Sequence, residues 1–81
     1  MGVLRVLSHH GDDRLTWDQR AVVAGDPEAV AAVKEAERIF EEQRQRGATA
    51  VKVATDRPAE RIGKFDPEAE QILMIPRVVG G

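Results

Sequence analysis

The chain of 81 residues contains no cysteine. This absence excludes disulfide bonds, a thiolate metal site and a cysteine nucleophile. It also means that no side chain of this protein can carry a thioester. Catalysis or metal binding through thiolate sulfur is therefore excluded.

A strong charge imbalance is also missing. The 12 basic and 14 acidic residues give a formal net charge of −2, which leaves no basic footprint for nucleic acid. The only aromatic residues are Trp17, Phe40 and Phe65, and we assign at least two of them to the core. We therefore expect no nucleic-acid partner.

Long apolar runs are absent as well. No run approaches the roughly 20 residues that a membrane-spanning helix needs. The N-terminal stretch MGVLRVLSHH lacks the long apolar segment of a signal peptide. We expect one small domain in a soluble, cytoplasmic protein without a membrane partner.

Alternating apolar and polar side chains predict a hairpin at the N-terminus. Residues 3–8 alternate loosely, and residues 14–17 alternate cleanly with Leu15 and Trp17 on one face. Between them, residues 9–13 read HHGDD, a composition typical of a turn. The first two strands are therefore expected to pair.

The turn contains four potential metal ligands: His9, His10, Asp12 and Asp13. Adjacent histidines at a strand end point to opposite faces, so they chelate one ion poorly. We expect a solvated hairpin turn here and no metal.

A long helix is predicted from Pro27 to Arg46. Asp26 can cap the free amides, and Pro27 suits the first helical position. Gly47 suits the left-handed residue that follows a helix. The predicted apolar stripe is formed by Ala29, Val33, Ala36 and Phe40, flanked by Val30, Ala32 and Ile39.

The remaining segments complete an α+β pattern. We predict strands at 49–54, 60–65 and 72–75, a turn at 56–58, and one helical turn at 67–70. Residues 18–25 form a connector that is either a short edge strand or a coil. The continuous apolar run ILMI at 72–75 suits a strand buried on both faces.

The last residues form the candidate functional segment. Pro76 ends the strand ladder because it has no N–H to donate. The residues after it are Arg77, Val78, Val79, Gly80 and Gly81. Valines favour an extended backbone, and glycines leave room for a close approach. A frayed terminus or a remnant of cloning is the alternative explanation of the two glycines.

An apolar strand, a proline, a valine-containing link and a final Gly-Gly together resemble the C-terminus of the bacterial sulfur carriers of the ThiS and MoaD type. These are ubiquitin-like β-grasp proteins. Pro76 matches their first proline, and Gly80-Gly81 matches their ending. Arg77 departs from their second proline and is closer to the ubiquitin style. The motif covers about a dozen residues.

The resemblance implies a ubiquitin-like β-grasp fold: a mixed sheet of four or five strands with one long helix packed across one face. It places the β-grasp domain at residues 1–76 and a flexible tail at 77–81. It also implies that an E1-like adenylating enzyme uses ATP to activate the Gly81 carboxylate, with Gly80 beside it. Arg77, Val78 and Val79 are then the residues that recognise the tail's partner.

Two fates of the activated tail stay open, a thiocarboxylate formed by a sulfur donor or conjugation to a lysine of a target protein. In both, this protein is a substrate with no bound cofactor, and not an enzyme. The alternative class is a non-covalent interaction or structural accessory module, such as one encoded by a phage or mobile element, with no chemistry at the tail.

Overall fold

The computed structural model describes residues 1–8 and 11–77. The elements follow one another as β1 (Gly2–Ser8), β2 (Gly11–Trp17), α1 (Gln19–Val23), α2 (Pro27–Gln45), β3 (Thr49–Ala54), β4 (Arg57–Arg61) and β5 (Gln71–Ile75). Neither helix in these ranges is both long enough and apolar enough to cross a membrane. The division into a domain at 1–76 and a tail at 77–81 stays a prediction.

β1 and β2 form the predicted hairpin. They pair antiparallel over their whole length, with Leu4 opposite Leu15 and Gly2 opposite Trp17. β2 begins at Gly11, so Asp12 and Asp13 are strand residues. The prediction of a turn was wrong for residues 11–13, because the pairing with β1 continues to the end of that strand.

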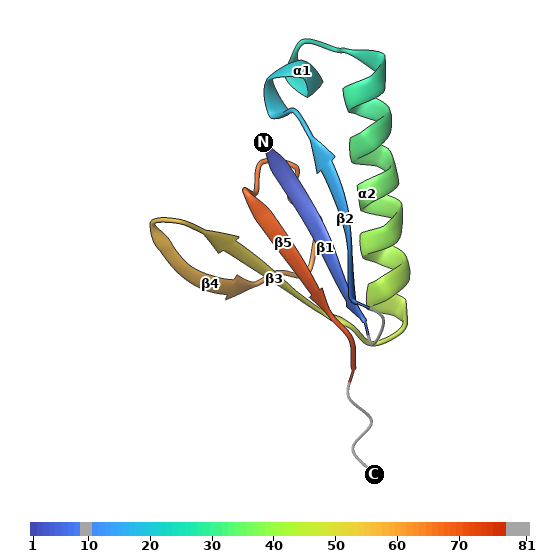
Figure 1. Ribbon diagram of the computed structural model, residues 1–81, viewed down its shortest axis with the longest axis vertical. Coiled ribbons are helices and arrows are strands. Elements are labelled where there is room, and N and C mark those ends of the chain that lie inside the picture. Colours follow the sequence, from blue (N-terminus) through green and yellow to red (C-terminus); the bar gives the residue numbers. More distant parts are fainter. Residues whose placement is uncertain (9–10, 78–81) are drawn as a thin grey trace.

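The sheet is mixed and has five strands in the order β2-β1-β5-β3-β4 (Figure 1). β1 and β5 lie parallel at its centre, and the other neighbours are antiparallel. Parallel pairing of the first and last strands needs a long crossover, which α2, β3 and β4 supply. This is the β-grasp arrangement, and the predicted fold class is confirmed.

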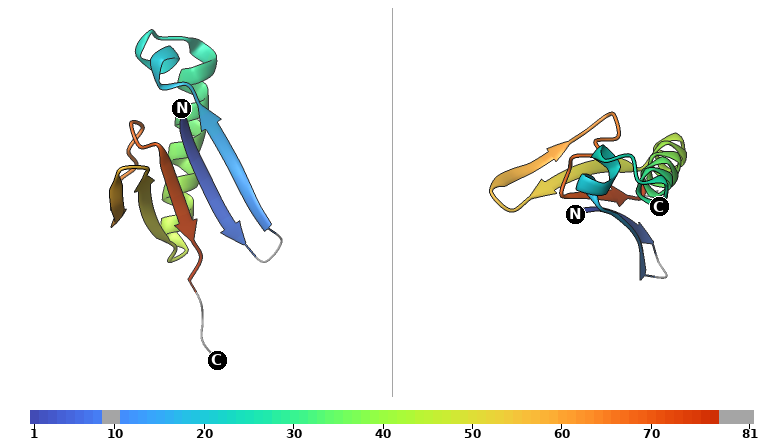
Figure 2. Two further views of the ribbon diagram at one scale, coloured as in Figure 1. Left: turned by 60° about the vertical axis from the view of Figure 1, so that its left-hand side comes forward. Right: turned by 90° about the horizontal axis from the view of Figure 1, so that it is seen from above.

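α2 lies across one face of the sheet (Figure 2). Asp26 caps its start by accepting a hydrogen bond from the backbone N–H of Glu28 at 3.2 Å. Gly47 follows its end with a φ of +92°, which the absence of a Cβ permits. Ala29, Ala36 and Phe40 are buried on its inner side. The predicted helix and its apolar stripe are confirmed, with the last residue at Gln45.

The core closes around three aromatic rings. Phe65 lies 5.5 Å from Trp17 and 5.8 Å from Phe40 between ring centroids. The indole N–H of Trp17 donates to the backbone carbonyl of Pro67 at 2.9 Å, and Gln19 donates to the carbonyl of Glu68 at 3.0 Å. These bonds hold the loop that leads into β5 against the end of β2.

Three local predictions were wrong. The connector contains α1, which Asp18 caps by accepting from two backbone N–H groups. The fourth strand is Arg57–Arg61 and includes Pro58, so residues 57–58 are strand and not turn. An edge strand tolerates proline because one side of its backbone needs no partner. Residues 67–70 hold a hydrogen-bonded turn and no helix.

β5 is buried on one face only, so the expected burial of both faces was wrong. Ile72 and Met74 are fully buried, whereas Ile75 is 39% exposed. α2 covers one side of the sheet, and no other described element covers the opposite side (Figure 2). We call this uncovered side the open face.

Candidate functional site

The base of the tail lies immediately after the central strand. β5 ends at Ile75, and Pro76 and Arg77 follow it as exposed residues. Proline cannot donate to the ladder, so the sheet ends there. Val78, Val79, Gly80 and Gly81 lie outside the described residues. Of the tail residues predicted to recognise a partner or to be activated, Arg77 is the one that the structure describes.

Arg77 packs on the turn that ends α2. A Cβ built on Gly47 would lie 3.1 Å from Cδ and 3.6 Å from Cβ of Arg77. The aliphatic stem of the arginine therefore covers this glycine, and a side chain at residue 47 would require the stem to move by a few tenths of an ångström. The contact joins the tail base to the helix end, and sequence spacing could not reveal it.

A pocket of about 520 Å³ opens beside this contact. Its lining includes the apolar side chains of Val6 and Ala48 and the charged side chains of Asp13, Arg46 and Arg77. Arg46 is held by Glu42 at 3.2 Å. A partner that binds the tail base meets apolar surface together with a guanidinium from the tail itself.

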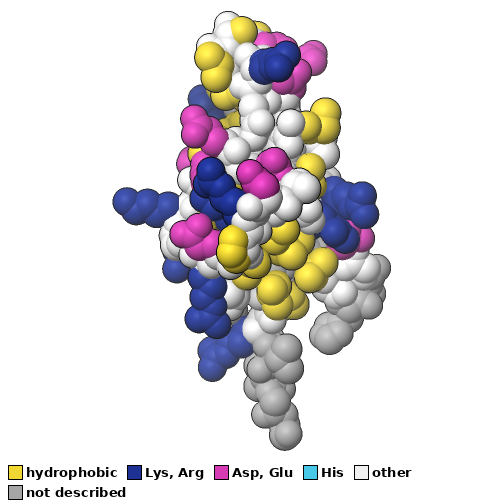
Figure 3. Space-filling model, turned by 90° about the vertical axis from the view of Figure 1, so that its left-hand side faces the viewer, with side chains coloured by type: hydrophobic (Ala, Val, Ile, Leu, Met, Phe, Trp, Pro, Cys, Tyr) yellow, Lys and Arg dark blue, Asp and Glu magenta, His cyan; other side chains and the backbone are white. Residues whose placement is uncertain are grey.

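The open face carries a row of residues that crosses all five strands. In register, Arg14 lies opposite Arg5, Arg5 beside Leu73, Leu73 beside Val51, and Val51 opposite Arg61. The row therefore has an apolar centre with arginines at both ends. Figure 3 shows hydrophobic side chains gathered in the lower half of this side, with Lys and Arg to either side of them.

One acidic residue organises the arginines on the β1–β2 side. The carboxylate of Asp12 lies 2.8 Å from the guanidinium of Arg5 and 3.1 Å from that of Arg14. Hydrogen bonds from Arg14 and Arg5 hold the pKa of Asp12 below its ordinary value. Two cations share one anion, so this end of the row keeps a net positive charge.

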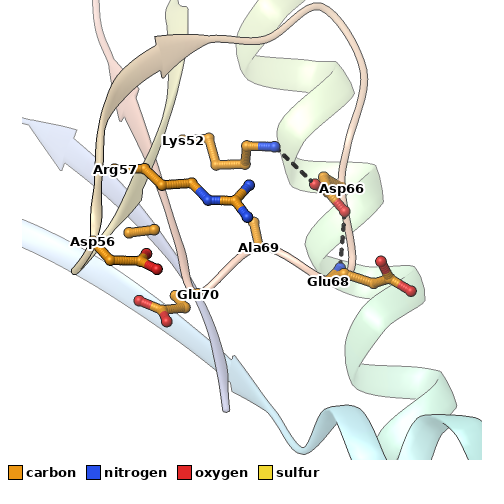
Figure 4. Close-up of a pocket in the computed structure, with 8 residues that line it drawn as sticks. Lys52, Asp56, Arg57, Asp66, Glu68, Ala69 and Glu70 are labelled. Carbon is orange, nitrogen blue, oxygen red and sulfur yellow. Dashed lines mark hydrogen bonds and ion pairs between the residues drawn. The ribbon is translucent and has the colours of Figure 1, made fainter.

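A polar pocket of about 400 Å³ lies between the β3–β4 hairpin and the loop before β5 (Figure 4). Lys52 contacts Asp66 at 3.3 Å, and Glu70 accepts from the backbone N–H of Thr55 at 3.1 Å. The guanidinium of Arg57 points into the space between them. Two of the four carboxylates that line the pocket, those of Asp66 and Glu70, hold the hairpin to the loop. The arrangement contains no activated nucleophile.

Of the four potential metal ligands in the first hairpin, the structure describes Asp12 and Asp13. Asp12 and Asp13 are successive residues of β2, so their side chains point to opposite faces of the sheet. His9 and His10 lie outside the described residues. No group of three potential ligands comes together among those that are described.

The lysines differ in their availability for conjugation. Lys34 and Lys64 are exposed. Lys52 is 29% exposed at its side chain, and its amine faces both Asp66 and Glu60. Lys52 is therefore the least accessible of the three lysines to an activated tail.

The arginine–apolar row is the feature that sequence reasoning missed. The alternation within each strand indicates which residues share a face. It does not indicate how strands far apart in the chain are aligned with one another. The row forms only because the observed alignment places these residues side by side.

Comparisons with protein-family models, curated proteins and solved structures found no match to this chain in any of the three. The functional argument therefore depends on the residues and the geometry described above.

Proposed function

We propose that this protein is a small ubiquitin-like sulfur carrier or protein modifier. In this proposal a partner adenylating enzyme activates the Gly81 carboxylate. The protein is the substrate of that enzyme and performs no catalysis of its own. The observation that carries the proposal is the β-grasp sheet, whose central last strand leads directly into a segment ending in Gly80-Gly81.

The position of the tail favours this function. β5 is paired on both sides, by β1 and by β3, and is therefore fixed along its length. The six residues after Ile75 can span at most about 20 Å when extended. A narrow channel in an enzyme can therefore accept the tail while the enzyme's surface contacts the folded domain.

The open face supplies a surface for that contact. Leu73 and Val51 form an apolar centre beside the tail, and Arg5 and Arg61 flank it in register. Burial of apolar area stabilises such a complex, and flanking charges select the partner. We therefore infer that the activating enzyme presents an apolar patch with an acidic border.

The chemistry at the tail has two steps. An oxygen of the Gly81 carboxylate attacks the α-phosphorus of ATP, which gives an acyl-adenylate and releases pyrophosphate. A sulfur nucleophile then displaces AMP from the acyl carbon. Sulfide gives a thiocarboxylate directly. A persulfide gives an acyl disulfide, which a second thiol of the donor enzyme cleaves to release the thiocarboxylate and leave a disulfide on that enzyme. An enzyme thiolate gives a thioester, which a lysine amine of a target opens to form an amide.

Intact mass of the protein purified from its own host tests this proposal. The comparison is with a form that lacks Gly81. A gain equal to the replacement of one oxygen by sulfur, or an adduct joined through Gly81, is the expected result. Either modification disappears in the shortened form. The same measurement establishes whether the mature chain ends at Gly81.

An unmodified mass in cells that contain an adenylating enzyme able to bind the protein would refute the proposal. Such a result would favour the second candidate, a non-covalent interaction module. The open face is the observation behind that candidate, because its apolar centre can bind a partner without any reaction at the tail.

A further inference from the structure

We propose that the outer edge of β2 binds an extended segment of another protein as a sixth strand, antiparallel to β2. The segment carries an aliphatic residue opposite Leu15, an acidic residue opposite Arg14 and a basic residue opposite Asp13. This interaction goes beyond the proposed function, because it needs no reaction at Gly81.

Of the two sheet edges, β2 is the one suited to strand addition. It has seven residues and no proline, and in Figure 2 (left) no described element lies beyond it. β4 forms the other edge, with five residues, Pro58 among them, and a register shift against β3. Proline and irregular pairing blunt an edge, whereas a long regular strand offers a template.

Hydrogen bonding in β1 shows which groups of β2 face outward. The N–H of Val3 bonds to the carbonyl of Glu70, on the β5 side. Because backbone direction alternates along a strand, Leu4 and Val6 bond toward β2, to Leu15 and Asp13.

The backbone groups of Asp12, Arg14 and Thr16 therefore point away from the sheet. They offer three N–H and three C=O groups to an added strand. Main-chain hydrogen bonds of this kind supply affinity, and the side chains on either face supply selectivity.

Side chains on the helix side of the edge select the partner. Leu15 is half-buried against the core, so an aliphatic neighbour extends the apolar surface. Among residues 1–8 and 11–77, none makes a hydrogen bond or ion pair with the Asp13 carboxylate, although Arg46 and Arg77 line the same pocket, so a basic residue opposite Asp13 adds an opposite-charge pair. Residues directly opposite each other on a sheet interact most strongly.

Side chains on the open face add a second preference. Arg14 shares Asp12 with Arg5, which leaves a net positive charge at this end of the sheet. An acidic residue opposite Arg14 neutralises it. In an antiparallel segment these preferences read aliphatic, acidic, basic along the chain.

A second copy of this chain is the wrong occupant. Two-fold pairing centred on Asp12, Asp13 or Arg14 places that charged residue opposite itself. Pairing centred on Leu15 places Asp12 opposite Asp18. Like charges directly opposite are destabilising. Pairing centred on Asp13 does set Asp12 opposite Arg14, and pairing centred on Thr16 sets Arg14 opposite Asp18. No two-fold register, however, supplies the aliphatic, acidic and basic residues together at the three positions, so another protein is the better occupant.

Amide hydrogen exchange measured by NMR tests the proposal on the full chain. The probe is a blocked nine-residue peptide of alternating threonine and valine with Val-Glu-Lys at its centre. Without peptide, the amides of Asp13 and Leu15 are protected, and those of Asp12, Arg14 and Thr16 exchange rapidly. With peptide, exchange slows at these last three positions, which gives protection at every residue of the edge.

A matched peptide and a matched variant test the charge assignment. Exchanging Glu and Lys in the probe turns two opposite-charge pairs into like-charge pairs, so binding is about tenfold weaker. The variant Asp13→Lys reverses the charge preference at residue 13. It therefore binds the exchanged peptide, which places Glu opposite this residue, better than the wild-type protein does. A merely structural role of Asp13 predicts no such reversal.

Three outcomes overturn the proposal. One is the absence of slowed exchange at Asp12, Arg14 and Thr16 at millimolar peptide. Another is protection that appears at β4 or on the open face instead. The third is protection of these amides without peptide that increases with protein concentration, which would assign the edge to a second copy.

Discussion

Replacing Gly47 by alanine tests the contact between the tail base and the end of α2. Gly47 has a φ of +92°, and a Cβ there would lie 3.1 Å from Cδ of Arg77. Gly25 is a matched control, because its φ is +82° and no atom lies within 4 Å of the added Cβ. The two substitutions share the backbone strain and differ in the steric contact.

The expected magnitudes follow from this difference. An alanine with positive φ costs about 1 kcal/mol, and we expect that loss for Gly25→Ala. At Gly47 the added methyl also displaces the stem of Arg77, which raises the loss to about 2 kcal/mol. The Cβ of Arg77 lies 3.6 Å away, an ordinary van der Waals contact, so the extra cost arises only from the crowded Cδ, and a total loss of about 2 kcal/mol is the upper value.

Urea unfolding followed by fluorescence measures these losses. Trp17 is the single tryptophan and is 3% exposed, so it reports on global unfolding. A domain of this size has a free energy of unfolding of about 4–12 kcal/mol, and a loss of 2 kcal/mol is therefore resolved. In the background Arg77→Ala, the cost of Gly47→Ala falls to that of Gly25→Ala.

Equal losses for the two glycine variants would refute the argument. A difference that persists in the Arg77→Ala background would refute it as well, because the extra cost would then arise elsewhere. If the contact exists, Gly47→Ala also moves the tail base and reduces modification at Gly81 in the folded protein.

Three further predictions concern the core, the ion pairs and the open face. Trp17→Phe removes the donor to the carbonyl of Pro67 and lowers the free energy of unfolding by about 1 kcal/mol, measured by circular dichroism; no change would contradict the bond. Asp12 has a lowered pKa when folded, so its contribution to stability is present above about pH 4 and is lost as the pH falls below it. Asp12→Asn therefore flattens the acid limb of a stability–pH curve, and an unchanged limb would count against the pairing. Leu73→Ser leaves the fold intact but reduces modification at Gly81 in cells, measured by intact mass. Undiminished modification would exclude the open face from partner binding.

The sequence predicted the elements whose signals are local. The helix from Pro27 has its cap, its proline and its following glycine within one continuous stretch, so its limits were correct to one residue. The strand Thr49–Ala54 was predicted with its observed bounds, because alternation is visible along it. The order of strands and helix agreed with the β-grasp that the resemblance of the C-terminal motif implied, and the sheet has that arrangement.

Local signals were weaker where an element is short or at an edge. α1 has five residues, too few for a periodic pattern, although Asp18 marks its start. Pro58 reads as a turn signal in isolation, and only its position on an edge strand makes it compatible with the sheet.

The sequence by itself determined the composition limits, the long helix, the alternation of β1 and the Gly80-Gly81 ending. Only the tertiary structure decided which faces are covered and which distant residues meet. The ILMI run is apolar throughout, yet a single helix covers one face and leaves Leu73 and Ile75 on the other. Arg77 meets Gly47 because β3 pairs with β5 and sets Thr49 opposite Ile75. Trp17 meets Pro67 because β1 pairs with both β2 and β5. Such contacts depend on register and layer order, which no local pattern of residues encodes.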